Sequence, residues 1–97
     1  MRKVLWWLIG GSRGGKNRLR IVRALDAEPM NANQLAETLA LDYKTVRHHL
    51  DLLEENGVVT TMGDGYGKMY FVSDEMKSNM DVLAEIAEQA NLGDVSG

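Results

Sequence analysis

The sequence predicts a single α+β domain that is mostly helical, with three core helices, a β-hairpin and a further C-terminal helix. The chain has 97 residues, a length that suits one hydrophobic core and leaves no room for a second. Four segments space their apolar residues three and four apart, as helices do. Residues 58–72 instead hold two strand-like runs around a glycine-rich turn. We expect residues 1–97 to divide into an apolar N-terminal segment (1–12), the core (13–72), and a C-terminal helix and tail (73–97).

The first core helix is predicted from about Asn17 to Leu25. Its apolar residues Ile21, Val22 and Leu25 share one arc of a helix. Pro29 restricts the backbone of the residue before it, so the helix is expected to end ahead of this position.

The second core helix has the clearest start signal in the chain. Asn31 is a preferred N-cap, and Gln34 three residues later completes a capping box. Met30 precedes the cap and is placed to pack against Leu35. The helix is expected to end near Ala40.

The third core helix is predicted from its N-cap, Asp42, to Asn56. It stops at Gly57, a residue that readily adopts the left-handed conformation found after many helices. Its apolar residues are spaced four and three apart and form a buried stripe: Val46, Leu50 and Leu53.

A β-hairpin is predicted with strands at 58–62 and 69–72, because both runs are rich in β-branched and aromatic residues. Three glycines among residues 63–67 indicate a turn longer than two residues. The last helix is capped by Ser73 or Asp74 and is predicted to continue as one helix to about residue 91. Its apolar residues recur with heptad spacing: Met76, Met80, Leu83, Ala87 and Ala90.

The composition excludes several classes of protein. There is no Cys, which rules out disulfides, a thiol nucleophile and metal sites built on thiolates. The longest apolar run, Val4–Ile9, has six residues, whereas a membrane-spanning helix needs about 20. These features suit a cytoplasmic protein, and no membrane partner is expected.

The net charge of −3 conceals an uneven distribution. Residues 1–50 hold nine of the eleven Lys and Arg residues, whereas residues 51–97 hold ten of the fourteen acidic residues. The acidic balance argues against a protein that coats nucleic acid non-specifically, because such binding depends on neutralising phosphates. A basic half still allows one face to meet a polyanion while the rest has another role.

The predicted order of helix, short helix, longer helix, hairpin and helix is that of a winged helix-turn-helix domain. Residues 31–42 look like the first helix and turn of that motif. Residues 43–59 closely resemble the recognition helix and following strand of ArsR-type winged-helix repressors. Residues 10–18 and 66–70 look like an archaeal-type subgroup of these regulators. The resemblance covers roughly residues 10–75.

This resemblance implies a homodimeric transcriptional repressor that places its recognition helix, about residues 42–56, in the major groove of a pseudo-palindromic operator. The hairpin wing would lie along the flanking backbone or minor groove. A helix about 10–12 Å wide fits a major groove of about 12 Å, so the physical dimensions agree. The thiolate metal box of metal-sensing members is absent, so no such metal site or cofactor is expected, and no small-molecule effector is identified.

Eight residues are candidate contacts to double-stranded DNA. Arg and Lys pair with guanine or phosphate, and Thr meets a thymine methyl or a phosphate. The candidates lie on the recognition helix, in the wing and before the first core helix: Tyr43, Lys44, Thr45, Arg47, His48, Lys68, Arg13 and Lys16. Asp51 shares the exposed helix face and either pairs with a neighbouring cation or lies past the edge of the DNA. Tyr66, at the wing tip, either faces outward or packs its ring on the loop.

Three further features have competing interpretations. Gly10–Asn17 has the glycine and lysine spacing of a phosphate-binding loop, but Asn17 replaces the required Ser or Thr, so a flexible link is favoured. His48 and His49 point about 100° apart on a helix and cannot chelate one ion together, so His49 is expected to be packed and hydrogen-bonded. Arg18 is expected to reach either a carboxylate or the DNA backbone.

The segment Val4–Ile9 is too apolar to remain exposed. It is expected to form an extra helix or strand packed on the terminal helix, or part of a dimer interface. A membrane surface is less favoured, because six residues offer little binding area. The dimer interface is predicted to be shared by Trp6, Trp7, Met76, Met80, Leu83 and Ala87.

The sequence shows no evident nucleophile–base pair, paired carboxylate site or metal cluster, so we expect the protein not to be an enzyme. A second interpretation stays open: a winged helix that binds protein, not DNA, as a subunit of a larger assembly. The acidic balance and the thinly basic wing favour this alternative, whereas Lys44 and Arg47 on the recognition helix disfavour it.

Overall fold

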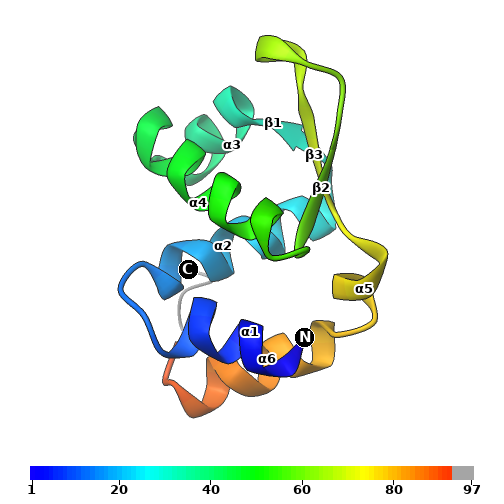
Figure 1. Ribbon diagram of the computed structural model, residues 1–97. Coiled ribbons are helices and arrows are strands. Elements are labelled where there is room, and N and C mark those ends of the chain that lie inside the picture. Colours follow the sequence, from blue (N-terminus) through cyan, green and yellow to red (C-terminus); the bar gives the residue numbers. More distant parts are fainter. Residues whose placement is uncertain (93–97) are drawn as a thin grey trace.

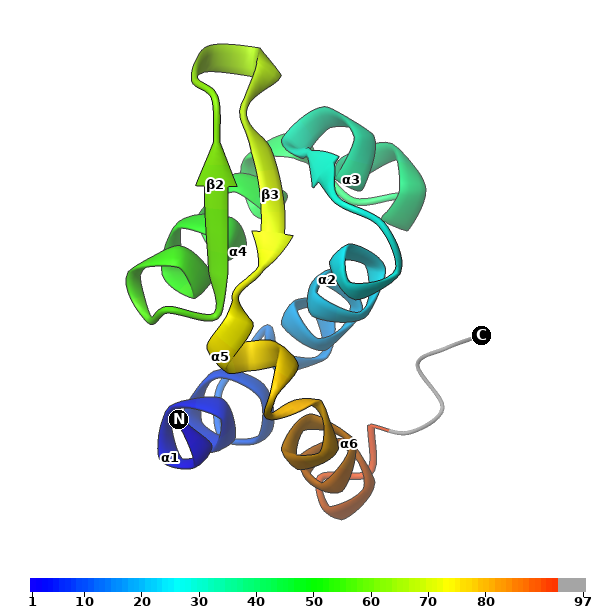
Figure 2. The same ribbon diagram turned by 90° about the vertical axis from the view of Figure 1, so that its right-hand side faces the viewer.

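The computed structural model describes residues 1–92 and confirms the predicted fold, a mostly helical domain with a small antiparallel sheet. Helices α2 (Gly15–Ala27), α3 (Ala32–Leu39) and α4 (Tyr43–Glu55) pack together in the middle of the molecule, and a hairpin projects from them (Figure 1). The N-terminal helix and the last helix lie side by side at the end far from the hairpin tip (Figures 1 and 2). The predicted tail at 93–97 lies outside the described residues.

The predicted signals that start α3 and α4 are confirmed. The Asn31 side chain accepts a hydrogen bond from the Gln34 backbone N–H at 2.8 Å, and the Gln34 side chain accepts one from the Asn31 N–H at 2.9 Å. This reciprocal capping box satisfies two donors that a helix leaves without partners inside it. At the start of α4, the Asp42 side chain accepts a hydrogen bond from the Thr45 N–H at 3.2 Å. Gly57, with a φ of 74°, follows the end of α4 as predicted.

The sheet has three strands, β1 (Met30–Asn31), β2 (Val59–Met62) and β3 (Met69–Val72), in the order β1-β3-β2. All neighbours are antiparallel, and the hairpin β2–β3 is the predicted wing. Its turn contains a short 3₁₀ helix, η2 (Gly65–Gly67). Strand β1 was not predicted from the sequence, because two residues are too few to show an alternating pattern.

The N-terminal apolar segment forms helix α1 (Arg2–Leu5) continued by one π-helical turn, η1 (Trp6–Gly10). This confirms an extra helix, and the alternative of a strand was wrong. The segment packs against α2 and against α6 (Met80–Gln89), and Arg2 forms an ion pair with Glu85 of α6 at 3.1 Å. Within the described residues, none of the helices combines the length and the apolar character needed to cross a membrane.

The prediction of one unbroken last helix was wrong. The chain instead forms α5 (Asp74–Lys77), capped by Ser73, and then α6, with Ser78 and Asn79 between them. At the break, the Asn79 side chain donates a hydrogen bond to the Glu75 carbonyl at 2.8 Å, and the Ser78 hydroxyl donates one to the Asp74 carbonyl at 3.3 Å. Such local bonds compete with helical backbone bonds, which explains the interruption.

One hydrophobic core joins the two parts of the molecule. Its fully buried side chains come from the N-terminal segment, the three central helices, the sheet and the last helices: Leu5, Leu8, Leu19, Ile21, Leu35, Val46, Leu50, Leu53, Tyr70, Met76, Leu83 and Ile86. Each buried Leu, Ile or Met contributes about 1.5–3 kcal/mol through removal of apolar surface from water. The core therefore fixes α4 on one side and leaves its other side to solvent.

Candidate nucleic-acid interface

Helix α4 is held across α3 by a tight turn, with one face in the core and one face outward. Ala40 adopts the left-handed conformation (φ 55°), and the Leu41 N–H donates to the Ala36 carbonyl at 2.9 Å, which closes the end of α3. Val46, Leu50 and Leu53 are fully buried, as predicted. The opposite side of α4 is solvent-exposed and carries Lys44, His48, Asp51 and Glu55. A helix with this arrangement can enter a DNA groove without disturbing its own packing.

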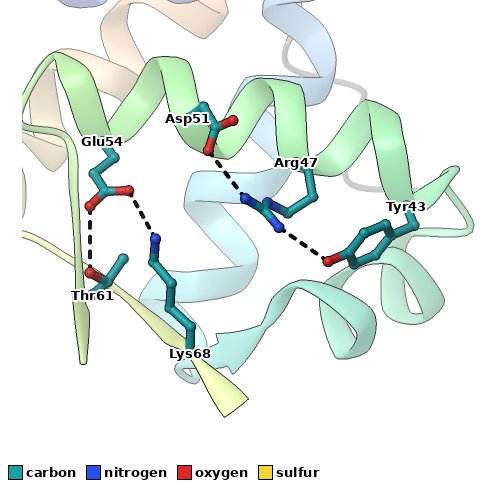
Figure 3. A network of polar contacts seen from close by, with 6 residues as sticks. All are labelled: Tyr43, Arg47, Asp51, Glu54, Thr61 and Lys68. Carbon is teal, nitrogen blue, oxygen red and sulfur yellow. Dashed lines mark hydrogen bonds and ion pairs between the residues drawn. The ribbon is translucent and has the colours of Figure 1, made fainter. Parts of the chain in front are cut away.

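The structure separates the predicted recognition-helix residues into two groups. Lys44 and His48 are exposed on the outward face, with half-buried Thr45 between them. Tyr43 and Arg47 are half-buried and face the wing instead (Figure 3). Only the first group projects outward from the helix surface.

A groove of about 380 Å³ runs between α4 and the wing, lined by Tyr43, Arg47, Gly65, Tyr66 and Lys68. In the groove, Arg47 Nη1 donates to the Tyr43 hydroxyl at 3.2 Å. This hydrogen bond is the largest of the effects that raise the pKa of Arg47 above its ordinary value. The guanidinium therefore stays positively charged in the groove.

Each cation of the groove is paired with an acidic residue of α4. Arg47 Nη2 lies 3.8 Å from Asp51 Oδ1, which matches the expectation that Asp51 pairs with a neighbouring cation. Lys68 Nζ lies 3.6 Å from Glu54 Oε1 and 5.4 Å from the centre of the Tyr70 ring. Lys68 thus lies in the wing between η2 and β3, and its side chain points towards α4 (Figure 3).

The wing tip itself presents no cation: its exposed side chains are Met62, Asp64 and Tyr66. Tyr66 is 81% exposed, so its ring does not pack on the loop, and Met62 is 68% exposed. The pairing of Glu54 with Lys68 was missed by sequence reasoning, because no spacing rule connects a helix residue with a wing residue fourteen positions later.

The basic loop before α2 lies against α4. A Cβ added to Gly14 would lie 2.8 Å from Cε1 of His49, which places the loop beside the recognition helix. Arg13 and Lys16 are exposed there. The loop and the first turn of α2 therefore bring Arg13 and Lys16, two of the predicted phosphate contacts, to the side of α4 on which His49 lies.

Arg18 reaches neither a carboxylate nor the outer surface, so both expectations for it were wrong. It is 2% exposed, and its guanidinium donates to the Leu8 carbonyl at 2.7 Å and the Arg13 carbonyl at 3.0 Å. It also donates to the Ser12 hydroxyl, and its Nη1 lies 3.1 Å from Nδ1 of His49. Arg18 thus orders the basic loop and ties it to α4.

His49 is packed and hydrogen-bonded, as predicted. It is 5% exposed, and Nδ1 accepts the hydrogen bond from Arg18. Burial lowers the pKa of His49, and the nearby charges of Arg18 and His48 lower it further. The ring is therefore neutral at physiological pH.

The structure also bears on the phosphate-loop and metal interpretations. The segment before Gly11 is the π-helical turn η1 and not a strand, so the strand–loop–helix context of a nucleotide-binding loop is missing in this part of the chain. Among residues 1–92, no group of three or more His, Cys, Asp or Glu residues is arranged to hold a metal ion.

The residues expected at the dimer interface differ in exposure. Met76, Leu83 and Ala87 are 0–1% exposed, because the chain's own residues cover them. Trp6 and Met80 are half-buried, and Trp7 is 53% exposed. Among these six residues, the exposed apolar surface is therefore centred on the N-terminal helical segment, not on the heptad pattern of the last helix.

The fold and the exposed second helix of the α3–α4 pair define a winged helix-turn-helix protein. Residues 16–61 match a family model described as a helix-turn-helix domain. No curated protein matches the sequence.

Solved structures share this fold over most of the chain. Reduced HlyU from Vibrio cholerae N16961 is 22% identical, with a TM-score of 0.66, over 88% of this chain and 87% of that chain. The transcriptional regulator HlyU from Vibrio vulnificus CMCP6 is 23% identical, with a TM-score of 0.63, over 94% and 86%. A probable transcriptional regulator from Pseudomonas aeruginosa is 21% identical, with a TM-score of 0.67, over 92% and 73%.

Proposed function

We propose that the protein is a sequence-specific transcriptional regulator of the ArsR-like, archaeal type that binds double-stranded DNA as a homodimer and represses by occupying a pseudo-palindromic operator. The observation that carries the proposal is the outward face of α4, which presents Lys44 and His48 to solvent while the core fixes the other face. The similar solved structures described as transcriptional regulators support it.

In this proposal the outward face of α4 reads bases and its surroundings hold the backbone. Lys44, Thr45 and His48 are placed for the major groove, where each base pair presents a distinct pattern of donors and acceptors. Arg13 of the adjacent loop and Lys16 of the first turn of α2 meet phosphates on one side of the helix, where Arg18 holds the loop in place. Phosphate contacts position such a domain, and base contacts supply its specificity.

In this proposal, contacts to matching bases, and not the net charge of the protein, must supply most of the affinity for DNA. Helix α4 holds Lys44 and Arg47 against three acidic residues, Asp51, Glu54 and Glu55. The whole chain has a net charge of −3. Non-specific attachment to phosphates is therefore weak, and tight binding requires an operator that matches the base-reading side chains.

The dimer is proposed to form through the end of the molecule that lies away from the wing. There α1, η1 and α6 pack side by side (Figure 1), and exposed Trp7 stands next to half-buried Trp6. An exposed Trp is a frequent anchor of protein interfaces because it buries a large area. Pairing through this layer leaves α4 and the wing of both subunits uncovered, so that both can contact DNA. The protein is proposed to act in the cytoplasm.

The test is selection of duplexes from a random-sequence pool, followed by fluorescence anisotropy with the selected duplex and scrambled versions at two salt concentrations. We expect a preference of about 10³-fold or more for the selected duplex, with affinity falling as salt rises. Failure to enrich any sequence, with only weak binding at low salt, would remove the proposal.

One observation favours a second candidate, a winged helix that binds protein. The wing presents Met62 and Tyr66 to solvent, 68% and 81% exposed, where a DNA-binding wing would carry cations at its tip. A stable complex of defined stoichiometry with another protein, lost in Tyr66→Ser and unaffected by Lys44→Ala, would establish this alternative.

A further inference from the structure

We propose that the groove between α4 and the wing is a phosphate site that receives a backbone phosphate of the bound DNA, and that Asp51 and Glu54 compete with this phosphate for Arg47 and Lys68. The inference rests on the proposed function and adds to it the two acidic residues that limit affinity. In this view Arg47 acts on the DNA backbone and not on a base.

The first step of the argument is the position of the two cations. Arg47 comes from α4 and Lys68 from the wing, between η2 and β3, and both line the same groove of about 380 Å³. Tyr43 and Tyr66 line it as well, and their phenol groups are hydrogen-bond donors (Figure 3 shows Tyr43). Two cations and two hydroxyl donors facing one open space suit a phosphate, which has a negative charge and several acceptor oxygens.

The second step concerns Arg47, whose donors are only partly used. One Nη1 donor reaches the Tyr43 hydroxyl at 3.2 Å, whereas Nη2 is 3.8 Å from Asp51, beyond hydrogen-bond distance. Nε has no acceptor among the described residues. The guanidinium is thus held weakly and can turn to a phosphate, which accepts two parallel N–H bonds from it.

The third step concerns Lys68, which is held in a similar way. Its ammonium is 3.6 Å from Glu54, again beyond a hydrogen bond, and Glu54 is shared with the Thr61 hydroxyl at 3.5 Å. Arg47 and Asp51 are 41% and 56% exposed, and Lys68 and Glu54 are 28% and 37% exposed. Water screens such pairs, so each is weak enough to be displaced by DNA.

The consequence is that Asp51 and Glu54 lower the affinity for DNA in two ways. They occupy the cations in the free protein, and they repel the phosphate that enters the groove. Neutralising either acid should therefore strengthen binding, although the acid touches no DNA in the proposal.

The experiment is an anisotropy titration of the selected duplex with Asp51→Asn, Glu54→Gln and Glu55→Gln. Glu55 is exposed on the same helix and takes part in no ion pair within residues 1–92, so its variant matches the change in net charge. We expect Asp51→Asn and Glu54→Gln each to bind about 2- to 5-fold more tightly than Glu55→Gln at low salt, and the difference to shrink at high salt.

A double-mutant cycle tests whether Glu54 acts through Lys68. The gain from Glu54→Gln should disappear in a Lys68→Met background, because the cation that it releases is gone. It should also disappear on a duplex in which a methylphosphonate neutralises the one phosphate that faces the wing, whichever position a scan identifies.

The outcomes separate the inference from the proposed function. Equal effects of the three neutralised acids, or a gain that persists without Lys68, would overturn the phosphate site while sequence-specific binding stands. Wild-type protein that prefers no duplex removes the proposed function first, and the inference falls with it.

Discussion

At the scale of single residues, Arg18 is the side chain on which the candidate interface depends most. A buried guanidinium without a carboxylate partner is rare, and here backbone carbonyls, Ser12 and His49 take its donors. It joins η1 and the basic loop, which are consecutive in the chain, to α4, which is distant in sequence. A change at Arg18 should therefore affect both the core and the face of α4 that is proposed to bind DNA.

We predict that Arg18→Ala lowers the free energy of unfolding by about 2–4 kcal/mol, because it leaves the Leu8 and Arg13 carbonyls without their donor and opens a cavity. Urea denaturation measures this change. Arg13→Ala, an exposed cation of the same loop, is the control and should stay within about 0.5 kcal/mol of wild type. Equal losses in the two variants would contradict the role assigned to Arg18.

The lowered pKa of His49 predicts how the free energy of unfolding depends on pH. Its pKa is lowered by burial first, and then by Arg18 and His48, so the unfolded chain takes up a proton at a higher pH than the folded chain does. Stability should therefore be constant above pH ~6.5, the usual pKa of an unfolded His, and fall as the pH drops below it. The fall should end once the pH passes below the pKa of folded His49.

The measurement is urea denaturation between pH 5 and pH 8, in buffers of equal ionic strength, with wild type and His49→Gln. Gln keeps a polar side chain without a titrating ring, so the variant should lose most of the slope between pH 5 and 6.5. His48→Gln, which changes the exposed neighbour, should keep it. A slope that survives in His49→Gln would show that carboxylates alone cause it.

At the scale of secondary-structure elements, the junction between η1 and α2 requires glycine. A Cβ on Gly15 would collide with the Ile9 carbonyl oxygen, because the first turn of α2 packs directly on the end of η1. Gly15→Ala should destabilise the protein by about 2 kcal/mol or more. Gly67→Ala is the matched control, since nothing lies within 4 Å of a Cβ there, and it should be nearly neutral by thermal denaturation. Similar melting temperatures for both variants would contradict this packing.

The elements were predictable from sequence where local chemistry decides them. Asn31 with Gln34, Asp42, and Gly57 are short-range signals, and they set the limits of α3 and α4 as expected. The break between α5 and α6 escaped prediction, because the heptad spacing of apolar residues continues across Ser78 and Asn79. Apolar periodicity reports the buried face and does not reveal side chains that bond to the backbone of their own helix.

The candidate site was predictable in its outline and not in its details. Helix spacing placed Lys44 and His48 on the outward face of α4 correctly. The direction of Arg47 depends on Tyr43 and on the wing, and the position of Lys68 depends on Glu54, so both are tertiary effects. Arg18 was misjudged for the same reason, since its partners belong to elements that the chain reaches only on folding.

At the scale of the whole molecule, the proposed DNA-binding surface and the proposed dimer surface lie in different parts of the fold. The wing projects at one end and the α1–α6 layer occupies the other, with α4 between them (Figure 2), within a molecule of 36 × 26 × 21 Å. Two subunits joined through that layer would present two recognition helices to one side of a duplex. Helix-turn-helix dimers place such helices about 34–36 Å apart, one turn of DNA.

The dimer is tested by substituting its proposed anchor. Trp7→Lys should shift the protein from dimer to monomer in sedimentation equilibrium, because a charge in the interface core is costly when unpaired. Tyr66→Lys changes an aromatic residue that is even more exposed, but on the wing, and should leave the mass of two subunits unchanged. A monomeric wild type, or a dimer indifferent to Trp7, would contradict this interface.

The most direct test of the central claim, that the outward face of α4 reads DNA sequence, is a comparison of Lys44→Ala with Lys77→Ala. Both variants lose one exposed lysine, one from the recognition helix and one from α5. Anisotropy with the selected duplex and its scrambled version gives the preference of each protein. We predict that Lys44→Ala loses about 5- to 100-fold of the preference, the range expected for one base contact, while Lys77→Ala keeps it. Equal preferences in the two variants would show that α4 does not read the DNA.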